Sequence, residues 1–326
     1  MNIHYCGDIS MEKIRWGLIG CGNVTEIKNG PGLYKCRDSE LAGVTNRTIE
    51  KAHDWVKRHG HGRVFGSAEE LLASEEIDIV YIAVTPDAHK ELALKAAKAG
   101  KHCYLEKPIA LSYADGEEIA HAFKAAGKKI FVAHYRRALP KTKTLKELME
   151  KISPVRSVRV FRSDSKKEIP LWRGNPAVAG GGVFFEGDVH LVDLLDELFG
   201  PLHGWKLDAI GRGGMEDRVS LITRGRDNIF ISGLWVYGAY KSEDLCEVYG
   251  DNGVLGFQAA GTGGRALLET AAGREEIVFH DEPHIGMPME QTVVDELLGR
   301  GRCPCTLRAA MTAFKICCEA RDAAAR

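Results

Sequence analysis

A carboxylate and an ammonium group stand side by side in the segment Glu106-Lys107-Pro108. The segment directly follows residues 102–105, which the apolar pattern predicts to be a short strand. In an open parallel sheet, ligands bind in the crevice at the carboxyl ends of the strands, so both side chains would stand on the crevice side. The other interpretation is a surface ion pair before a proline.

A second group of titratable side chains lies on the predicted helix 184–199, which follows three glycines at 180–182. Glu186, His190 and Asp193 are spaced by four and three residues, so all three can share one helical face. A carboxylate beside an imidazole fixes its tautomer and raises its basicity, which suits proton transfer near neutral pH. Most other positions of this helix are apolar, so the polar face must meet water, a cleft or a partner.

The third segment, at residues 14–25, is typical of a buried strand that leads into a glycine-rich turn and then a helix. Gly20 permits the tight turn, and Gly22 lets backbone N–H groups approach a pyrophosphate at the helix N-terminus. Glycine turns after strands are also common as plain tight loops, so this motif alone decides little.

The end of the next predicted strand, 41–45, bears on the choice of dinucleotide. An acidic residue there would bind the ribose 2′-hydroxyl of NAD, but the chain continues with Asn46, Arg47 and Thr48. Arg47 can pair with a 2′-phosphate and stack on adenine, while Asn46 and Thr48 can donate hydrogen bonds. We therefore expect NADP in preference to NAD; the alternative is that Arg47 is an exposed arginine in a turn.

The elements that position these segments alternate between strand and helix up to about residue 134. After the first turn, the predicted elements are strands at 41–45, 77–84, 102–105 and 130–133, and helices at 49–59, after Ser67, after Thr85 and at 112–126. This alternation predicts a doubly wound α/β domain with a parallel sheet over residues 1–139.

From residue 155 the pattern changes to short alternating strands with glycine-rich joints. The predicted strands are 158–162, 220–223, 229–235 and 245–249. They predict an open, mainly antiparallel sheet in a second domain, 140–326. The closing helix predicted at 306–325 is available to pack back on the first domain.

Composition and cysteine usage narrow the classes of partner. With 44 basic and 45 acidic residues, the charge gives no reason to expect nucleic acid or an anionic membrane as partner. No apolar run approaches the roughly 20 residues that span a bilayer, and residues 1–12 lack the order of a signal peptide. Nine cysteines without a CxxC pair are expected to be reduced thiols, and their spacing matches no usual zinc site. We expect a cytoplasmic protein that binds a small molecule and no metal.

Together these segments resemble the Gfo/Idh/MocA family, named for glucose-fructose oxidoreductase, inositol dehydrogenase and a rhizopine-catabolism protein. The likeness spans nearly the whole chain, and the ordered combination is more specific than any one motif. The motifs are Gly17-Leu-Ile-Gly20-Cys-Gly22-Asn-Val, Val84-Thr85-Pro86 followed by His89, Glu106-Lys107-Pro108, and the run from Trp172-Arg173 through Ala179-Gly-Gly-Gly182 to His190 and Asp193.

The resemblance implies a two-domain oxidoreductase. A Rossmann domain would hold NAD or NADP, and the second sheet domain would cover the nicotinamide and a sugar-like or cyclitol substrate. Lys107 would orient and polarise the reacting hydroxyl or carbonyl, His190 would be the acid/base, and the nicotinamide would carry the hydride. The residues implied in cofactor binding are Gly20, Gly22, Asn23, Val24, Asn46, Arg47, Thr48, Thr85, Pro86, His89, Glu106 and Lys107.

The chain departs from the family pattern beside the histidine. Glu186 stands where an aspartate is usual, and Asp188 stands where a small residue is common. The extra methylene could reposition the carboxylate, so either Glu186 or Asp188 would support His190. Glu186 is the third catalytic candidate.

Aromatic and guanidinium groups near the crevice are candidate substrate contacts. They are Tyr135, Arg136 and Arg137, after the last predicted strand of the first domain, and Trp172 and Arg173, before the glycine run. An aromatic face can pack against a sugar ring, and an arginine can hold hydroxyls or an acid group. Each can equally serve packing between the domains.

The leading hypothesis is an NADP-preferring oxidoreductase that acts on a sugar, a sugar derivative, a cyclitol or a related carbonyl compound. One alternative is a glycoside-cleaving enzyme that retains its nicotinamide for transient oxidation followed by elimination. Another is a cofactor-binding sensor without catalysis, against which the presence of both Lys107 and His190 argues. Because open sheets in such second domains often pair face to face, we expect a homodimer or homotetramer.

Overall fold

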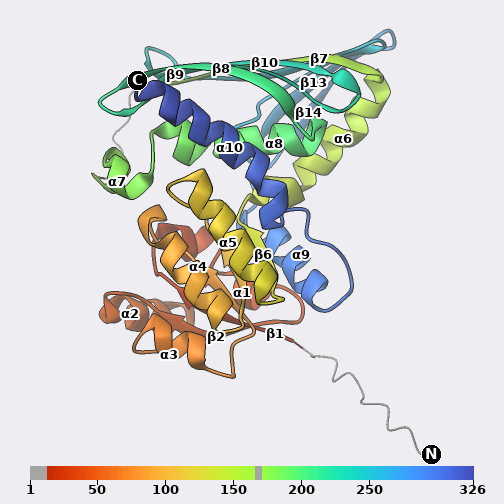
Figure 1. The fold of residues 1–326 in the computed structure, drawn as a ribbon. Helices are drawn as coiled ribbons and strands as arrows, with labels where there is room; N and C mark the ends of the chain where they lie inside the picture. Colours follow the sequence, from red (N-terminus) through yellow and green to blue (C-terminus); the bar gives the residue numbers. More distant parts are fainter. Residues whose placement is uncertain (1–12, 166–170) are drawn as a thin grey trace, which may run out of the picture.

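A computed structural model describes residues 13–165 and 171–326, which form two β-sheets stacked with helices between and around them (Figure 1). Residues 1–12, with Cys6 and the expectation about a signal peptide, lie outside the described residues. The fold class expected from the sequence, a parallel sheet followed by a mainly antiparallel one, is confirmed.

The first sheet has six strands in the order β3-β2-β1-β4-β5-β6, and every neighbouring pair is parallel. Its strands are β1 Ile14–Ile19, β2 Ser39–Thr45, β3 Arg63–Val64, β4 Ile79–Ile82, β5 His102–Leu105 and β6 Ile130–Val132. All four residues of β4 are buried, as expected where helices cover both faces of a parallel sheet. Strand β5 has the bounds predicted from the sequence.

Five helices accompany this sheet: α1 Gly32–Lys35, α2 Ile49–His59, α3 Ala68–Ala73, α4 His89–Lys98 and α5 Tyr113–Ala125. Local chemistry sets their ends. The Ser67 hydroxyl accepts a hydrogen bond from the Glu70 N–H at 3.1 Å, and the Glu70 carboxylate accepts one from the Gly66 N–H at 2.8 Å. The predicted cap is therefore present, although Glu70 reaches Gly66 rather than Ser67.

The helix expected after the glycine turn is short. It is a single π-helical turn, η1 Val24–Lys28, and Pro31 follows soon after. Because proline has no backbone N–H and fixes its own φ, the chain cannot continue the same helix through this point. The chain resumes as α1.

The second sheet has eight strands in the order β14-β13-β12-β11-β7-β10-β9-β8, with all neighbours antiparallel except the parallel pair β7 and β10. Its strands are β7 Val155–Ser165, β8 His203–Arg212, β9 Met215–Arg224, β10 Phe230–Ala239, β11 Glu243–Gly250, β12 Gly253–Phe257, β13 Gly264–Thr270 and β14 Gly273–Phe279. Strands β8, β12, β13 and β14 were not predicted from the sequence. They lie at or near the sheet's edges, where charged residues such as Arg274 and Glu275 interrupt the apolar pattern.

Helices cover one face of the large sheet and connect it to the first sheet. They are α6 Pro140–Ile152, α8 Val189–Phe199 and α10 Leu307–Ala324, with α7 Pro176–Ala179 and α9 Met287–Leu297 to the sides. Helix α10, dark blue in Figure 1, contacts β8 and α8 on one side and α5 and β6 on the other. An isolated bridge between Phe131 and Thr306 ties its start to the first sheet. Among the helices that the structure describes, none combines the length and apolar character that crossing a bilayer requires.

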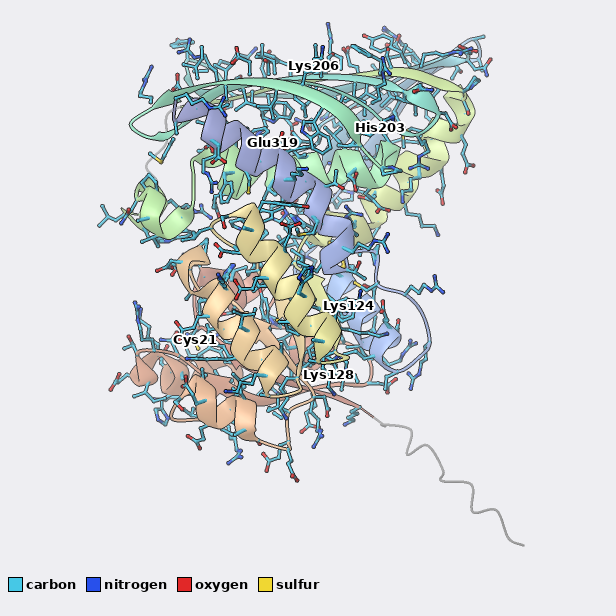
Figure 2. The ribbon with its side chains drawn as sticks, in the orientation of Figure 1. Cys21, Lys124, Lys128, His203, Lys206 and Glu319 are labelled. Atoms are coloured by element: carbon cyan, nitrogen blue, oxygen red, sulfur yellow. The ribbon has the colours of Figure 1, made fainter. Side chains whose placement is uncertain are left out.

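The other face of the large sheet points outward, at the top of Figure 2. On β8, the Trp205 indole donates to the Glu319 carboxylate of α10 at 2.7 Å, whereas the next residue, Lys206, lies on the outer face. Ile222 and Leu234 are 48% and 42% exposed on neighbouring strands and line a hollow of about 960 Å³ with Lys206. The expected homodimer or homotetramer stays a prediction.

The eight cysteines within the described residues are free thiols. Burial raises the pKa of Cys21, in the glycine turn, to about 12. A thiol of this kind stays protonated and unreactive at neutral pH.

Candidate functional site

The carboxyl ends of the parallel strands bring the predicted cofactor segments to one edge of the first sheet. Backbone hydrogen bonds join successive strand ends: Gly20 N–H to Thr45 C=O at 2.9 Å, and Glu106 N–H to Ile82 C=O at 3.0 Å. The loops that follow β1, β2, β4, β5 and β6 therefore border a common crevice.

The glycine turn fits a dinucleotide pyrophosphate. Gly20 has φ +107°, and a Cβ there would lie 2.4 Å from the Ala83 carbonyl oxygen, so only glycine is tolerated. A Cβ at Gly22 would meet nothing within 4 Å, so its backbone faces open space at the start of η1. Asn23 is exposed beside it, and Val24 begins η1.

The turn after β2 is tied to the glycine turn through Asn46. Its Oδ1 accepts from the Cys21 N–H at 3.1 Å, and its Nδ2 donates to the Thr48 carbonyl at 3.0 Å. Both polar atoms of the Asn46 side chain are therefore hydrogen-bonded within the two turns. Arg47 and Thr48 are exposed, which leaves both side chains accessible to a ligand.

His89 lies behind the crevice rather than in it. The side chain is fully buried, with Nδ1 2.8 Å from the Pro108 carbonyl oxygen and Nε2 3.1 Å from that of Val84. It thus fixes the loop after β5 against the end of β4. Thr85 is half-buried, and Pro86 is buried at the start of the short helix η2 Pro86–Ala88.

Lys107, in the loop after β5, pairs with Glu186 of the helical turn 184–188. Its Nζ donates to Oε1 of Glu186 at 2.6 Å and to the Glu186 backbone carbonyl at 2.7 Å. Burial acts to raise the pKa of Glu186, but the charges of Lys107 and Arg173 outweigh it and lower that pKa. Glu186 is therefore an ionised anchor that fixes the direction of the Lys107 ammonium group.

Glu106 is buried, and its carboxyl group forms hydrogen bonds that stabilise the same loop. Its carboxyl accepts from the Tyr81 hydroxyl at 2.6 Å, from Asn29 Nδ2 at 3.0 Å and from the Lys107 N–H at 3.2 Å. Burial raises its pKa, and Lys107 opposes that shift. Glu106 thus holds Lys107 in place through its backbone.

Glu290, on α9, is a second buried carboxyl next to this network. It is fully buried, and neither oxygen has a hydrogen-bond partner among the described residues. Burial, and after it the nearby Glu106, raises its pKa well above the usual value. An unpaired carboxyl in such surroundings is neutral in the folded protein.

The Glu290→Gln variant is expected to lose less stability than the wild type as the pH rises from about 5 to about 8. The pKa of Glu290 is higher in the folded protein than in the unfolded chain. Its contribution to the free energy of unfolding is therefore fully present below the unfolded-state pKa and is lost as the pH rises through the folded-state pKa. Glutamine cannot ionise, so this loss disappears. Denaturant unfolding at about pH 5 and about pH 8 measures the free energy of unfolding of both proteins. Glu117→Gln, at an exposed position, is the control. An identical pH dependence of wild type and variant would contradict a neutral Glu290.

His190 stands in the first turn of α8, 9% exposed, with its Nδ1 3.3 Å from Nδ1 of His134. The Tyr135 ring lies against it, with centroids 4.9 Å apart. Burial lowers the pKa of His190 well below 6.5, and the Lys107 charge is the next cause. Lys107 and His190, distant in sequence, therefore share one electrostatic site.

The acidic residues near His190 do not support it as the helical spacing suggested. Glu186 and Asp188 belong to a π-helical turn, η5 Phe184–Asp188, whose wider winding shifts the face that each residue occupies. Glu186 binds Lys107, while Asp188 accepts from Arg162 Nε at 2.9 Å and from the Tyr237 hydroxyl at 2.6 Å. The hydrogen-bonding neighbour of His190 is instead His134.

Asp193 is paired with Arg137, whose guanidinium donates to both carboxylate oxygens at 2.7 and 2.8 Å. Arg137 is buried and also reaches Glu197 of α8 at 3.0 Å. It therefore joins the helical turn η3 Tyr135–Ala138 to α8, which is a packing role rather than a substrate contact.

The other substrate candidates differ in their surroundings. Tyr135 lines a cavity of about 630 Å³ together with Asn23, Lys28, Ala260 and Thr262. Arg136 donates through Nη2 to the Ala260 carbonyl, and its buried Nε and Nη1 have no partner within the described chain. Arg173 reaches Glu186 at 3.1 Å and stacks on Trp172, its Cζ 5.2 Å from the ring centroid.

Two residues of this region were missed by the sequence analysis. His134 comes two residues after the end of β6 and just before Tyr135, so its position was a usable signal. Lys141 gave no such signal: it lies in α6, and its Nζ donates to the carbonyls of Gln258, Gly261 and Gly263 at 2.7, 3.0 and 2.7 Å. These bonds hold the loop that carries Ala260 and Thr262 against the cavity.

Comparison with known proteins agrees with this geometry. A family model described as "Oxidoreductase family, NAD-binding Rossmann fold" matches residues 14–134, and one for the "GFO/IDH/MocA C-terminal domain" matches residues 142–256. "Oxidoreductase P35" of Formosa agariphila is 32% identical over 310 residues, which cover 92% of this chain and 95% of the relative.

Two further proteins extend the comparison. A 1,5-anhydro-D-fructose reductase of Ensifer adhaerens is 26% identical over 249 residues, 74% of each chain. The crystal structure of an aldose-aldose oxidoreductase from Caulobacter crescentus complexed with glycerol shares the fold, with a TM-score of 0.82 at 21% identity, covering 96% of this chain and 98% of that one. The chain belongs to the Gfo/Idh/MocA family of oxidoreductases, and its first sheet is that family's NAD(P)-binding Rossmann fold.

Proposed function

We propose that this protein transfers a hydride between a nicotinamide cofactor and the hydroxyl or carbonyl carbon of a sugar, sugar derivative or cyclitol. The observation that carries the proposal is the convergence of Lys107 and His190 in one largely buried site. A fixed cation can bind a substrate oxygen, and a neutral imidazole beside it can exchange that oxygen's proton. The relative named 1,5-anhydro-D-fructose reductase supports a sugar-like carbonyl as substrate.

Each residue has a defined task in this proposal. Two of the three N–H bonds of Lys107 go to Glu186, so the third is available for the substrate oxygen. His190 would accept the hydroxyl proton at Nε2, because its Nδ1 faces His134. In the reverse direction the same atom returns the proton. The bound nicotinamide supplies the hydride chemistry.

The environment of this pair suits a small polyol. Tyr135 offers an aromatic face beside His190, whereas the two unpartnered donors of Arg136 are buried. Because Tyr135 lines the cavity of about 630 Å³ and lies against His190, we assign it to substrate binding.

We further propose NADP as the preferred cofactor, held at its pyrophosphate by the Gly20 to Gly22 turn. The accessible Arg47 would bind the 2′-phosphate, with Thr48 beside it. A guanidinium can donate two parallel hydrogen bonds to a phosphate, whereas NAD offers only a hydroxyl there.

Arg47→Asp is expected to lower the ratio of kcat/KM for NADP to that for NAD by about tenfold to a hundredfold, because a charge-assisted contact is replaced by repulsion. Initial rates with both cofactors measure the ratio. The control is Lys124→Asp, which makes an equal charge change in the last turn of α5 (Figure 2). After α5 the chain continues to the amino-terminal end of β6, away from the crevice. An unchanged ratio in Arg47→Asp would remove the basis for preferring NADP.

The function itself is tested by incubating the purified protein with NADPH and NADH in parallel against a panel of keto-sugars and aldoses. The proposal predicts consumption of reduced cofactor with at least one sugar-like carbonyl, measured by the cofactor's absorbance. Cleavage of a glycoside with cofactor that stays bound and shows no net turnover would contradict it in favour of oxidation followed by elimination.

A further inference from the structure

A second buried histidine lies against His190. His134 is 1% exposed, and its ring is nearly perpendicular to that of His190, at 88°, with the two Nδ1 atoms 3.3 Å apart. A hydrogen bond needs one nitrogen with a proton and one without. The two tautomers are therefore coupled: when one ring carries Nδ1–H, the Nδ1 of the other is bare.

The two rings have different charged neighbours, although Lys107 and Arg136 disfavour a positive charge on both. Oδ2 of Asp193, a fully buried residue, lies 4.0 Å from Nδ1 of His134, and Arg137 holds both of its oxygens in place. His190 instead faces the Lys107 ammonium group. A positive charge is thus better accommodated on His134 than on His190.

We propose that His134 is a positioning residue that acts through His190 as a proton relay: it takes the Nδ1 proton of His190 while His190 takes the substrate proton at Nε2. The inference rests on the proposed function, because it assumes that His190 exchanges the substrate proton.

The relay balances in atoms and charge. During oxidation, the substrate O–H bond breaks and its proton bonds to Nε2 of His190, while the hydride passes to the oxidised nicotinamide. The Nδ1–H bond of His190 breaks, and that proton bonds to Nδ1 of His134, which becomes an imidazolium. His190 ends neutral, and the positive charge lies beside Asp193 instead of Lys107. Reduction reverses each transfer.

The charged groups around both rings bear on the transfer of a proton from His190 to His134. The charged groups that face them are Asp193 of α8, Arg136 and Arg137 of η3, Lys107 after β5 and Lys28 of η1. Burial lowers the pKa of His134 to about 4, and Asp193 opposes that shift. Burial and then Lys107 lower the pKa of His190 well below its usual value. Both rings are neutral at rest. Asp193 favours a positive charge on His134, whereas Arg137, Lys107 and Arg136 oppose it.

Two substitutions separate a relay from a simple hydrogen bond. His134→Phe keeps an aromatic ring without nitrogen, and His134→Asn keeps a polar group that cannot carry the proton. We expect both to lower kcat by about tenfold to a hundredfold with little change in KM, and His121→Phe, at an exposed site on α5, to be unchanged. Full activity in His134→Asn would overturn the relay, because a hydrogen bond alone would then suffice.

A second readout needs no substrate or turnover. In protein labelled with ¹⁵N-histidine, the ring signals missing from His134→Asn identify His134, and those missing from His190→Gln identify His190. On acidification, we expect the imidazolium shift to appear on His134 before His190. The opposite order would overturn the relay even if the enzyme is active, whereas an inactive wild type with the expected order would count against the proposed function alone.

Discussion

Lys107→Ala is expected to lower kcat by about a hundredfold to a thousandfold while the Kd for NADPH changes only a fewfold. The Nζ group is held by two hydrogen bonds to Glu186 and keeps a third donor for the reacting oxygen. That donor interacts most strongly when negative charge develops on the oxygen in the transition state. Its removal therefore affects turnover much more than ground-state cofactor binding.

The measurement pairs steady-state rates with a fluorescence titration of NADPH. Lys98→Ala, an exposed lysine in the last turn of α4, is the matched control and is expected to leave both quantities unchanged. Comparable losses in kcat and cofactor affinity for Lys107→Ala would contradict the orienting role and point to a structural one.

His190→Gln is expected to lower kcat by about a hundredfold to ten-thousandfold, because glutamine cannot accept or return the substrate proton. The wild-type pH profile gives a second signature. As a base in oxidation, His190 must be neutral, and burial lowers its pKa well below 6.5. The rate of oxidation is therefore expected to stay level as the pH falls to about 6.5 and to decline only below it.

The profile of His190→Gln is expected to lack this acidic decline, since the titrating group is gone. The exposed His121→Gln serves as control and keeps the wild-type profile. A decline centred above pH 7 in the wild type, or one that persists in His190→Gln, would mean that another group carries the proton.

The sequence predicted the first sheet well because its signals are local. Helix α2 has the bounds expected from apolar spacing and from Gly60, which adopts the left-handed conformation at φ 73° after its last turn. Lys107 could be placed at the crevice because it follows the short predicted strand 102–105, and the alternation of strands and helices around it indicates a parallel sheet. Each inference needed only the neighbouring residues.

The arrangement around His190 could not be predicted in the same way. Regular α-helical spacing placed Glu186 beside His190, but the π-helical turn at 184–188 directs its carboxylate to Lys107. The contact between His134 and His190 joins residues 56 positions apart, so it depends on how α8 packs against the end of β6. Such pairings are set by tertiary packing, which local periodicity does not record.

The central claim is that hydride passes between the cofactor and the substrate carbon. We would incubate the wild-type enzyme and a carbonyl substrate with two preparations of NADPH, each deuterated on a different face of the reactive nicotinamide carbon. Mass spectrometry then measures the deuterium content of each product. With one of the two cofactors, the account predicts a product that carries a single deuterium at the former carbonyl carbon. A product that forms without deuterium from either cofactor would contradict it.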